Sequence, residues 1–210
     1  MLDPQDYLKF LFALFAILNP PGAIPVLMSI TAEQGQADRV ATARTATVSV
    51  FIILLTALFF GEALLHFFGI SIHSFRVGGG ILILMMALSM MHARSTDTKQ
   101  TQEESLEAAN RQSVAVVPLA MPILAGPGAI SAVILFGHRS SSWEHLVTVT
   151  VLMGILSLIL YPFLRFSAPI SRRLGQTGIN IMTRVMGLIL AAIAVEFIAN
   201  GLKGLFPSLL

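Results

Sequence analysis

Long apolar runs separated by short polar connections dominate the chain. A transmembrane helix needs about 20 mostly apolar residues, and six runs meet that requirement. The pattern therefore predicts an all-α integral membrane protein with six transmembrane helices embedded in a lipid bilayer. The predicted spans cover 7–30, 46–68, 75–91, 113–137, 146–166 and 183–205.

Two of these runs are interrupted by proline and glycine, at 19–25 and at 122–128. The interruptions belong to a wider repetition. PPGAIPV at 20–26 resembles GPGAISA at 126–132, an offset of 106 residues, and RVGGGIL at 76–82 resembles RVMGLIL at 184–190, an offset of 108. Matched segments in the same order predict an internal duplication, with repeat 1 at 1–92 and repeat 2 at 113–210. A polar linker at 93–112 joins them.

Composition agrees with a membrane protein. Apolar residues make up 55% of the chain and charged residues 11%, against about 25% charged in a soluble domain. The net charge is only +2 and no basic patch occurs, so no nucleic-acid partner is predicted. Cysteine is absent, and the histidines at 73, 92, 138 and 145 are assigned to loops without metal-ligand spacing. We therefore predict no metal site and no cofactor.

Lysine and arginine predict the orientation in the membrane. Nine of them follow the first, third and fifth spans and four lie on the other side, which favours a cytoplasmic location for the nine and for the linker. Asp3 and Asp6 precede the first run, so it is interpreted as a retained span rather than a signal peptide. Both termini are then periplasmic. Since each half has three spans, the two halves enter the membrane with opposite polarity, which predicts inverted-topology repeats.

The interruptions predict broken first and fourth helices. Proline lacks an N–H, and unpaired backbone groups in lipid cost several kcal/mol each. A single break is better explained by an ordinary proline kink, but two matching breaks favour a binding site near the midplane. Half-helix N-termini suit a carboxylate, and loose carbonyls with the Asn19 amide suit an ammonium group. The predicted substrate-binding residues are Asn19, Pro20, Gly22, Ala23, Ala125, Gly126, Gly128 and Ala129.

Three charged residues within spans are candidates for ion coupling or gating. Glu196 lies in the apolar run 191–199. It is either a proton or ammonium partner in the translocation path, a buried protonated side chain hydrogen-bonded to a neighbouring helix, or a side chain near enough to the surface to reach water. Arg76 and Arg184 occupy equivalent repeat positions. They are either gate residues that pair with Glu62 or Glu196, or interfacial anchors. Glu62 and His66 lie one helical turn apart and form either a proton relay or an interfacial pair.

The residues at 19–25, 75–79 and 121–130 resemble the MarC family, and the similarity extends across essentially the whole chain. Segments 196–198 and 201–204 place the resemblance nearest to its SnatA-like branch. The resemblance implies a six-span inner-membrane protein. It further implies transport of small neutral amino acids such as glycine and alanine, and it gives no basis for assigning catalytic residues.

The sequence thus predicts a secondary transporter that holds a small neutral amino acid between two broken helices and alternates its access. No Walker-type phosphate loop occurs, so an ion gradient is the expected energy source, and Glu196 makes the proton the first expectation. An exporter or channel for another small polar solute is the alternative. A membrane-embedded enzyme is disfavoured because Ser29, Ser113 and Ser131 have no nearby catalytic partners. A homo-oligomer is compatible with this pattern.

Overall fold

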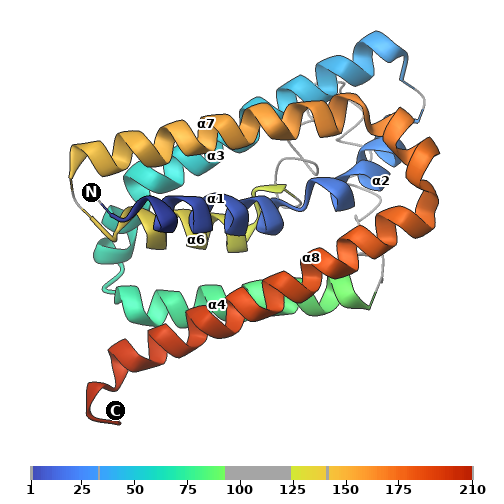
Figure 1. Ribbon diagram of the computed structural model, residues 1–210. Helices are drawn as coiled ribbons and strands as arrows, with labels where there is room; N and C mark the ends of the chain where they lie inside the picture. The colour runs from blue at the N-terminus through green and yellow to red at the C-terminus, as the bar shows by residue number, and fades with distance from the viewer. Residues whose placement is uncertain (1, 33, 93–123, 141, 210) are drawn as a thin grey trace.

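A computed structural model describes residues 2–32, 34–92, 124–140 and 142–209, and every regular element in these ranges is helical (Figure 1). The helices are α1 (Pro4–Leu18), α2 (Pro20–Ile30), α3 (Gln36–Phe67), α4 (Ile72–Met91), α6 (Pro127–Gly137), α7 (Trp143–Arg165), α8 (Ser167–Leu205) and the short 3₁₀ helix η2 (Pro207–Leu209). The all-α class predicted from the apolar runs is confirmed.

Five segments of the described part are long and apolar enough to cross a membrane, with α1 and α2 together forming the first at Pro4–Ile30. They correspond to the predicted spans 1, 2, 3, 5 and 6. The predicted fourth span is represented by α6, which ends at Gly137 as expected. The first half of that span and the linker at 93–112 lie outside the described residues, as do Pro118 and Pro122.

Two helices begin much earlier than the predicted spans. Helix α3 starts at Gln36 rather than at 46, and α8 starts at Ser167 rather than at 183. Hydropathy detects only the apolar part of a helix. Each of these helices begins with polar turns that precede its apolar part. Within α8, Gly175 has φ 61° and ψ 177° and interrupts the helical backbone. Glycine adopts this positive φ because it lacks a Cβ.

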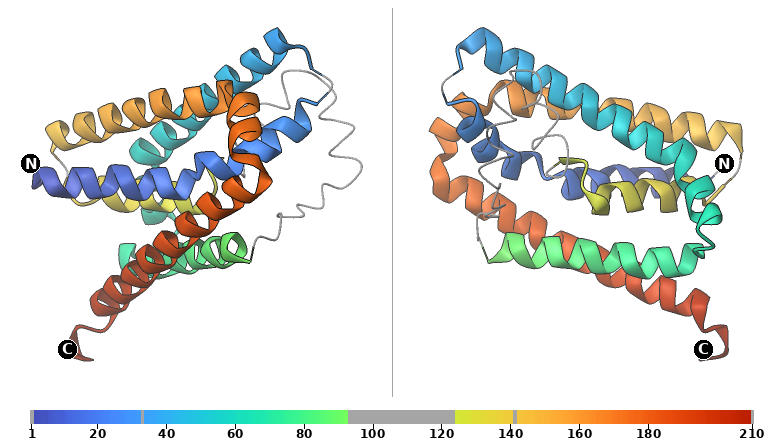
Figure 2. Two further views of the ribbon diagram at one scale, coloured as in Figure 1. Left: turned by 45° about the vertical axis from the view of Figure 1, so that its right-hand side comes forward. Right: turned by 180° about the vertical axis from the view of Figure 1, so that it is seen from behind.

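The helices form two antiparallel pairs around a central group (Figures 1 and 2). Helices α3 and α7 pack together on one side and α4 and α8 on the other, while α1, α2 and α6 lie between them. Helices α2 and α6 leave the middle of the molecule in opposite directions, and both termini lie at the same end. These directions are those that inverted repeats require. The repeat itself stays a prediction, since part of its second copy lies outside the described residues.

Close backbone contact joins α4 and α8 through glycine. A Cβ on Gly80 would lie 3.0 Å from the carbonyl oxygen of Ala194, and one on Gly187 would lie 3.0 Å from that of Ala87. Small residues at these places let the two helices approach, as is common where helices meet in membranes. Gly78, by contrast, is exposed and has no heavy atom within 4 Å of its Cβ position.

Candidate functional site

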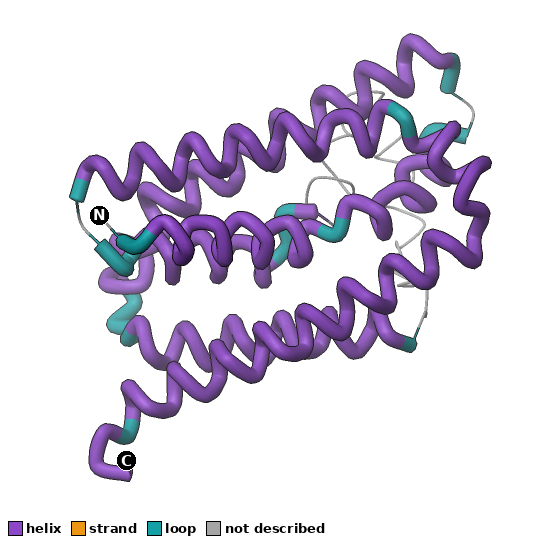
Figure 3. The backbone as a smooth tube through the Cα atoms, in the orientation of Figure 1, coloured by secondary structure: helices purple, strands orange, loops and turns teal. Residues whose placement is uncertain are grey.

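The first helix break lies at Asn19, between α1 and α2 (Figure 3). Asn19 has φ 44° and ψ 62°, a left-handed conformation that asparagine tolerates better than most residues. Its N–H donates to the carbonyl oxygens of Phe15 (3.1 Å) and Ala16 (3.2 Å), which ends α1. The predicted break is confirmed, but it is narrower than expected. Helix α2 continues through Pro25 instead of starting after it.

The first turn of α2 is capped by Asn19 itself. The Gly22 N–H donates to the Asn19 Oδ1 (3.2 Å), and the Ala23 N–H donates to the Asn19 carbonyl (3.2 Å). Pro20 and Pro21 have no N–H to offer. The amides of this turn are therefore occupied in this conformation, contrary to the expectation that a half-helix N-terminus presents free N–H groups. A carboxylate could bind there only after the Asn19 side chain turned away.

The second break lies at Gly126, immediately before α6. Gly126 is the N-cap residue with an extended backbone, and Pro127 opens the helix. The N–H groups of Ala129 (3.0 Å) and Ile130 (3.1 Å) both donate to the Gly126 carbonyl. Among the described residues no side chain caps this N-terminus. Of the two half-helix N-termini, the one of α6 is thus without a side-chain cap, whereas the one of α2 is capped by Asn19.

The structure brings the two breaks together. The Cβ position of Gly128 lies 3.7 Å from the Ile17 Cγ2, and Ile17 belongs to the last turn of α1. It lies 3.1 Å from the Ile83 Cγ1 of α4. Most of the predicted binding residues around the breaks are buried, and only Asn19 and Gly22 are half-buried. The two breaks therefore face protein rather than lipid.

A cavity of about 1260 Å³ lies between α1, α6, α7 and α8, and α4 contributes Arg76 to it. None of the eight predicted binding residues lines this cavity. The lining residues closest in sequence to the breaks are Ala16, in the turn before Asn19, and Ala132, one turn after Gly128. The cavity thus extends towards the breaks without including them.

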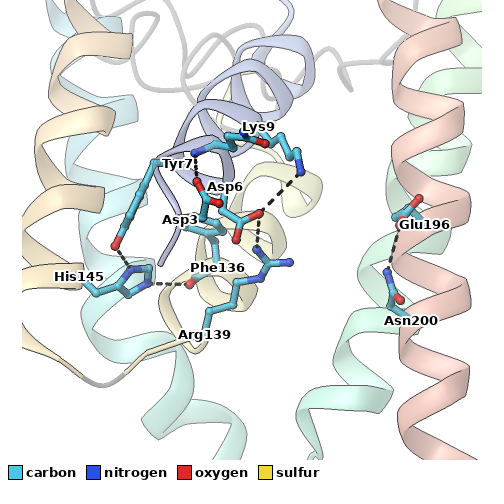
Figure 4. A network of polar contacts seen from close by, with 10 residues as sticks. Asp3, Asp6, Tyr7, Lys9, Phe136, Arg139, His145, Glu196 and Asn200 are labelled. Atoms are coloured by element: carbon cyan, nitrogen blue, oxygen red, sulfur yellow. Dashed lines mark hydrogen bonds and ion pairs between the residues drawn. The ribbon is translucent and has the colours of Figure 1, made fainter. Parts of the chain in front are cut away.

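Charged side chains gather at one end of the cavity (Figure 4). The Asp6 Oδ1 lies 3.8 Å from the Arg139 Nη1 and 3.9 Å from the Lys9 Nζ. Glu196 faces this group from α8, across the cavity, and its Oε1 accepts from the Asn200 Nδ2 at 3.5 Å. This bond stays within one helix and Glu196 is exposed, so the expected alternative of a buried interhelical glutamate is wrong.

Two of the three predicted gating residues meet at this cavity. Arg76 and Glu196 both line it, whereas Arg184 is exposed on α8 and does not. Glu62 pairs with neither arginine. Its Oε1 lies 2.8 Å from the Nδ1 of His138, so the predicted pairing of Glu62 with His66 is wrong. The pairing follows from the packing of α3 against α6, which sequence spacing does not reveal.

Sequence reasoning missed a buried polar group formed by Tyr7, His145 and the Phe136 carbonyl (Figure 4). The His145 Nε2 lies 2.9 Å from the Phe136 carbonyl oxygen, which can only accept, so Nε2 donates. In a neutral ring the Nδ1, 2.8 Å from the Tyr7 hydroxyl, then accepts from it. His145 is completely buried in the first turn of α7, so its assignment to a loop is wrong. Ser142, which caps that turn, was the available signal.

Within the described ranges no three histidine or acidic side chains come together as metal ligands. The site is therefore built from backbone breaks, an apolar cavity and a charged mouth. Together these features offer backbone groups, apolar walls and charged side chains to a ligand.

Comparison with known proteins places the chain among membrane proteins. A family model described as MarC family integral membrane protein matches residues 5–206. The chain is 47% identical over 208 residues to UPF0056 membrane protein YhcE of Escherichia coli (strain K12), covering 99% of this chain and 97% of the relative. It is 38% identical over 198 residues to UPF0056 membrane protein YvbG of Bacillus subtilis (strain 168), covering 94% of each. No solved structure matches.

Proposed function

The chain belongs to the MarC family of integral membrane proteins, and on that premise we propose that it is a secondary transporter of small neutral amino acids in the inner membrane. The observation that carries the proposal is the position of the two helix breaks. They pack against each other beside an open cavity, as the approach of Gly128 to Ile17 indicates. Broken helices near the midplane are the usual substrate site of such transporters.

In the proposed mechanism, the substrate binds between the two breaks. Its carboxylate displaces the Asn19 side chain from the Gly22 N–H, and the released amide oxygen accepts from the substrate ammonium. The cap is thereby exchanged for the substrate, so no backbone group is left unpaired. Access alternates when the α4–α8 pair moves against the central helices. In this movement the second half of the chain adopts the conformation that the first half had before.

We propose a proton as the coupling ion, with Glu196 as its carrier. Glu196 lines the cavity and has a single weak partner in Asn200, at 3.5 Å. A carboxylate in this place can gain or lose a proton as the cavity opens to either side of the membrane.

The test is uptake by the purified full-length protein in liposomes. Labelled glycine or alanine should accumulate above its external concentration when a proton gradient is imposed. Accumulation that needs a sodium gradient would support the proposed transport activity but would show that sodium, and not the proton, is the coupling ion. Uptake that equilibrates without a gradient and never accumulates would refute coupled transport and favour a channel, and no uptake of either amino acid would refute the assigned substrate class.

Two sets of variants test whether the proposed residues are needed for transport. Gly22→Leu combined with Gly128→Leu should abolish uptake, because a Cβ at position 22 would displace the Asn19 side chain and one at position 128 would press against Ile83 and Met86. Gly78→Leu is the matched control, since its Cβ position meets nothing within 4 Å. Glu196→Gln should fold normally and lose gradient-driven accumulation, whereas Glu144→Gln, an exposed acid at the start of α7, should not. Normal accumulation by Glu196→Gln across pH would end the proton-coupling hypothesis.

A further inference from the structure

The cavity has apolar walls at the depth of the membrane spans. Phe12 of α1 is 70% exposed and Leu8 is 54% exposed, yet both line it. Ile159 of α7 and Ile189 of α8 contribute to the same wall. Water in such a space would find few hydrogen-bond partners, and a water needs two to four of them to be held. The lining of this part of the cavity therefore suits an apolar ligand better than water.

The cavity is also too large for the amino acid that the proposed function assigns to the breaks. Its 1260 Å³ exceed the roughly 300–1,000 Å³ of ordinary small-molecule pockets. A solute the size of glycine would touch only a fraction of these walls, and its charges would face the side chains of Phe12 and Ile189. A longer, largely apolar molecule fits the volume and the chemistry of the lining.

The charged end of the cavity completes this description. Lys9, Arg76 and Arg139 line it together with two acids, Asp6 and Glu196. Asp6 is shared between Lys9 and Arg139 at 3.9 and 3.8 Å, while Arg76 has no ion-pair partner among the described residues. Arginine presents planar paired donors that match a phosphate group. An anionic phosphate next to a long apolar tail is the chemistry of a membrane phospholipid.

We propose that this cavity binds a phospholipid, with its phosphate between Arg76 and Arg139 and an acyl chain along Phe12, Ile159 and Ile189. This ligand is additional to the transported solute. Its binding can be measured without any substrate, so the result does not depend on the proposed transport activity.

The experiment is native mass spectrometry of the full-length protein, delipidated in mild detergent and then supplied with palmitoyl-oleoyl phosphatidylglycerol. We expect one lipid to be retained per chain. Arg76→Gln combined with Arg139→Gln should weaken retention roughly tenfold through loss of two charge-assisted contacts. Arg184→Gln is the control, because this arginine is exposed on α8 outside the cavity. Equal retention by the double variant and the parent would overturn the proposal.

A second variant tests the tail separately and does not depend on the charges. Ala192 is an exposed residue that lines the cavity, so Ala192→Phe should exclude the acyl chain, whereas Ala199→Phe, exposed on the same helix outside the cavity, should not. Glycerol 3-phosphate supplied instead of the lipid should not be retained. Equal retention of glycerol 3-phosphate would indicate a phosphate site alone. A lipid-free dimer would show that a second copy covers the groove, and either result would refute the proposal.

Discussion

Replacing Tyr7 by phenylalanine tests the buried polar group that joins α1 to α6 and α7. The variant removes the hydroxyl that lies 2.8 Å from the His145 Nδ1 and leaves that nitrogen unpaired in a fully buried place. The aromatic ring stays, so its edge-to-face contact with Phe136, at 5.8 Å between centroids, is kept. The expected loss is therefore that of one polar contact and not of packing.

The magnitude follows from two limits. An unsatisfied buried polar group costs about 1–3 kcal/mol, whereas hydrogen bonds between membrane helices measured by double-mutant cycles average about 0.6 and reach about 1.7 kcal/mol. Because His145 is completely buried, we expect a loss of about 1–2 kcal/mol in the free energy of unfolding. For a chain of this size that lowers Tm by about 2–8 °C.

The assay is reversible unfolding in a denaturing detergent, followed by the fluorescence of Trp143. This residue is the single tryptophan of the chain and lies in the same first turn of α7 as His145. Tyr161→Phe is the matched control. It removes a hydroxyl that accepts from the Arg165 Nη1 at 3.0 Å at an exposed place, and should change stability by less than about 0.5 kcal/mol.

A double variant decides whether the effect belongs to the contact. In a His145→Leu background the acceptor is gone, so adding Tyr7→Phe should cost nothing further. Equal losses from Tyr7→Phe with and without His145 would refute the argument, as would a loss no larger than that of Tyr161→Phe.

Further predictions concern the first break and the contact between α3 and α6. Asn19→Ala removes the cap on Gly22 and places alanine at φ 44°, so it should cost about 2–3 kcal/mol. Asn19→Gly keeps the favourable backbone and should cost less; equal losses in the same unfolding assay would contradict the left-handed cap. Gly61→Ala should cost about 1–3 kcal/mol, because its Cβ would overlap the Ile134 side chain, and Ile134→Ala should relieve that loss. Gly78→Ala, with open space around it, should be neutral or gain up to about 1 kcal/mol; a loss equal to that of Gly61→Ala would disprove the close contact.

The helix breaks could be found from the sequence because their causes are local. Proline removes an N–H wherever the chain goes, so Pro20 and Pro127 each begin a helix in the structure as their positions predict. The length of each apolar run likewise predicted the spans. The true start of α3 at Gln36 was missed, because polar turns of a helix outside the bilayer leave no hydropathy signal.

Much of the candidate site could not be found in this way. Whether Asn19 occupies the amide of Gly22, and whether Glu196 lies in a cavity or in a packed core, depends on side-chain positions in the folded molecule. In the sequence, His145 is one of several scattered histidines. Its burial against Tyr7 requires α1 and α7 to meet at that level.

The sequence alone therefore determined the membrane class, the spans and the two breaks, because apolar length and backbone chemistry act within one segment. Only the tertiary structure decided which distant residues meet, such as Glu62 with His138 rather than with His66. It also decided where the cavity lies between α1 and α8. The physical reason is that helix packing depends on how side chains of several helices fit together. The hydrophobic periodicity of one helix therefore does not identify the residues that it contacts.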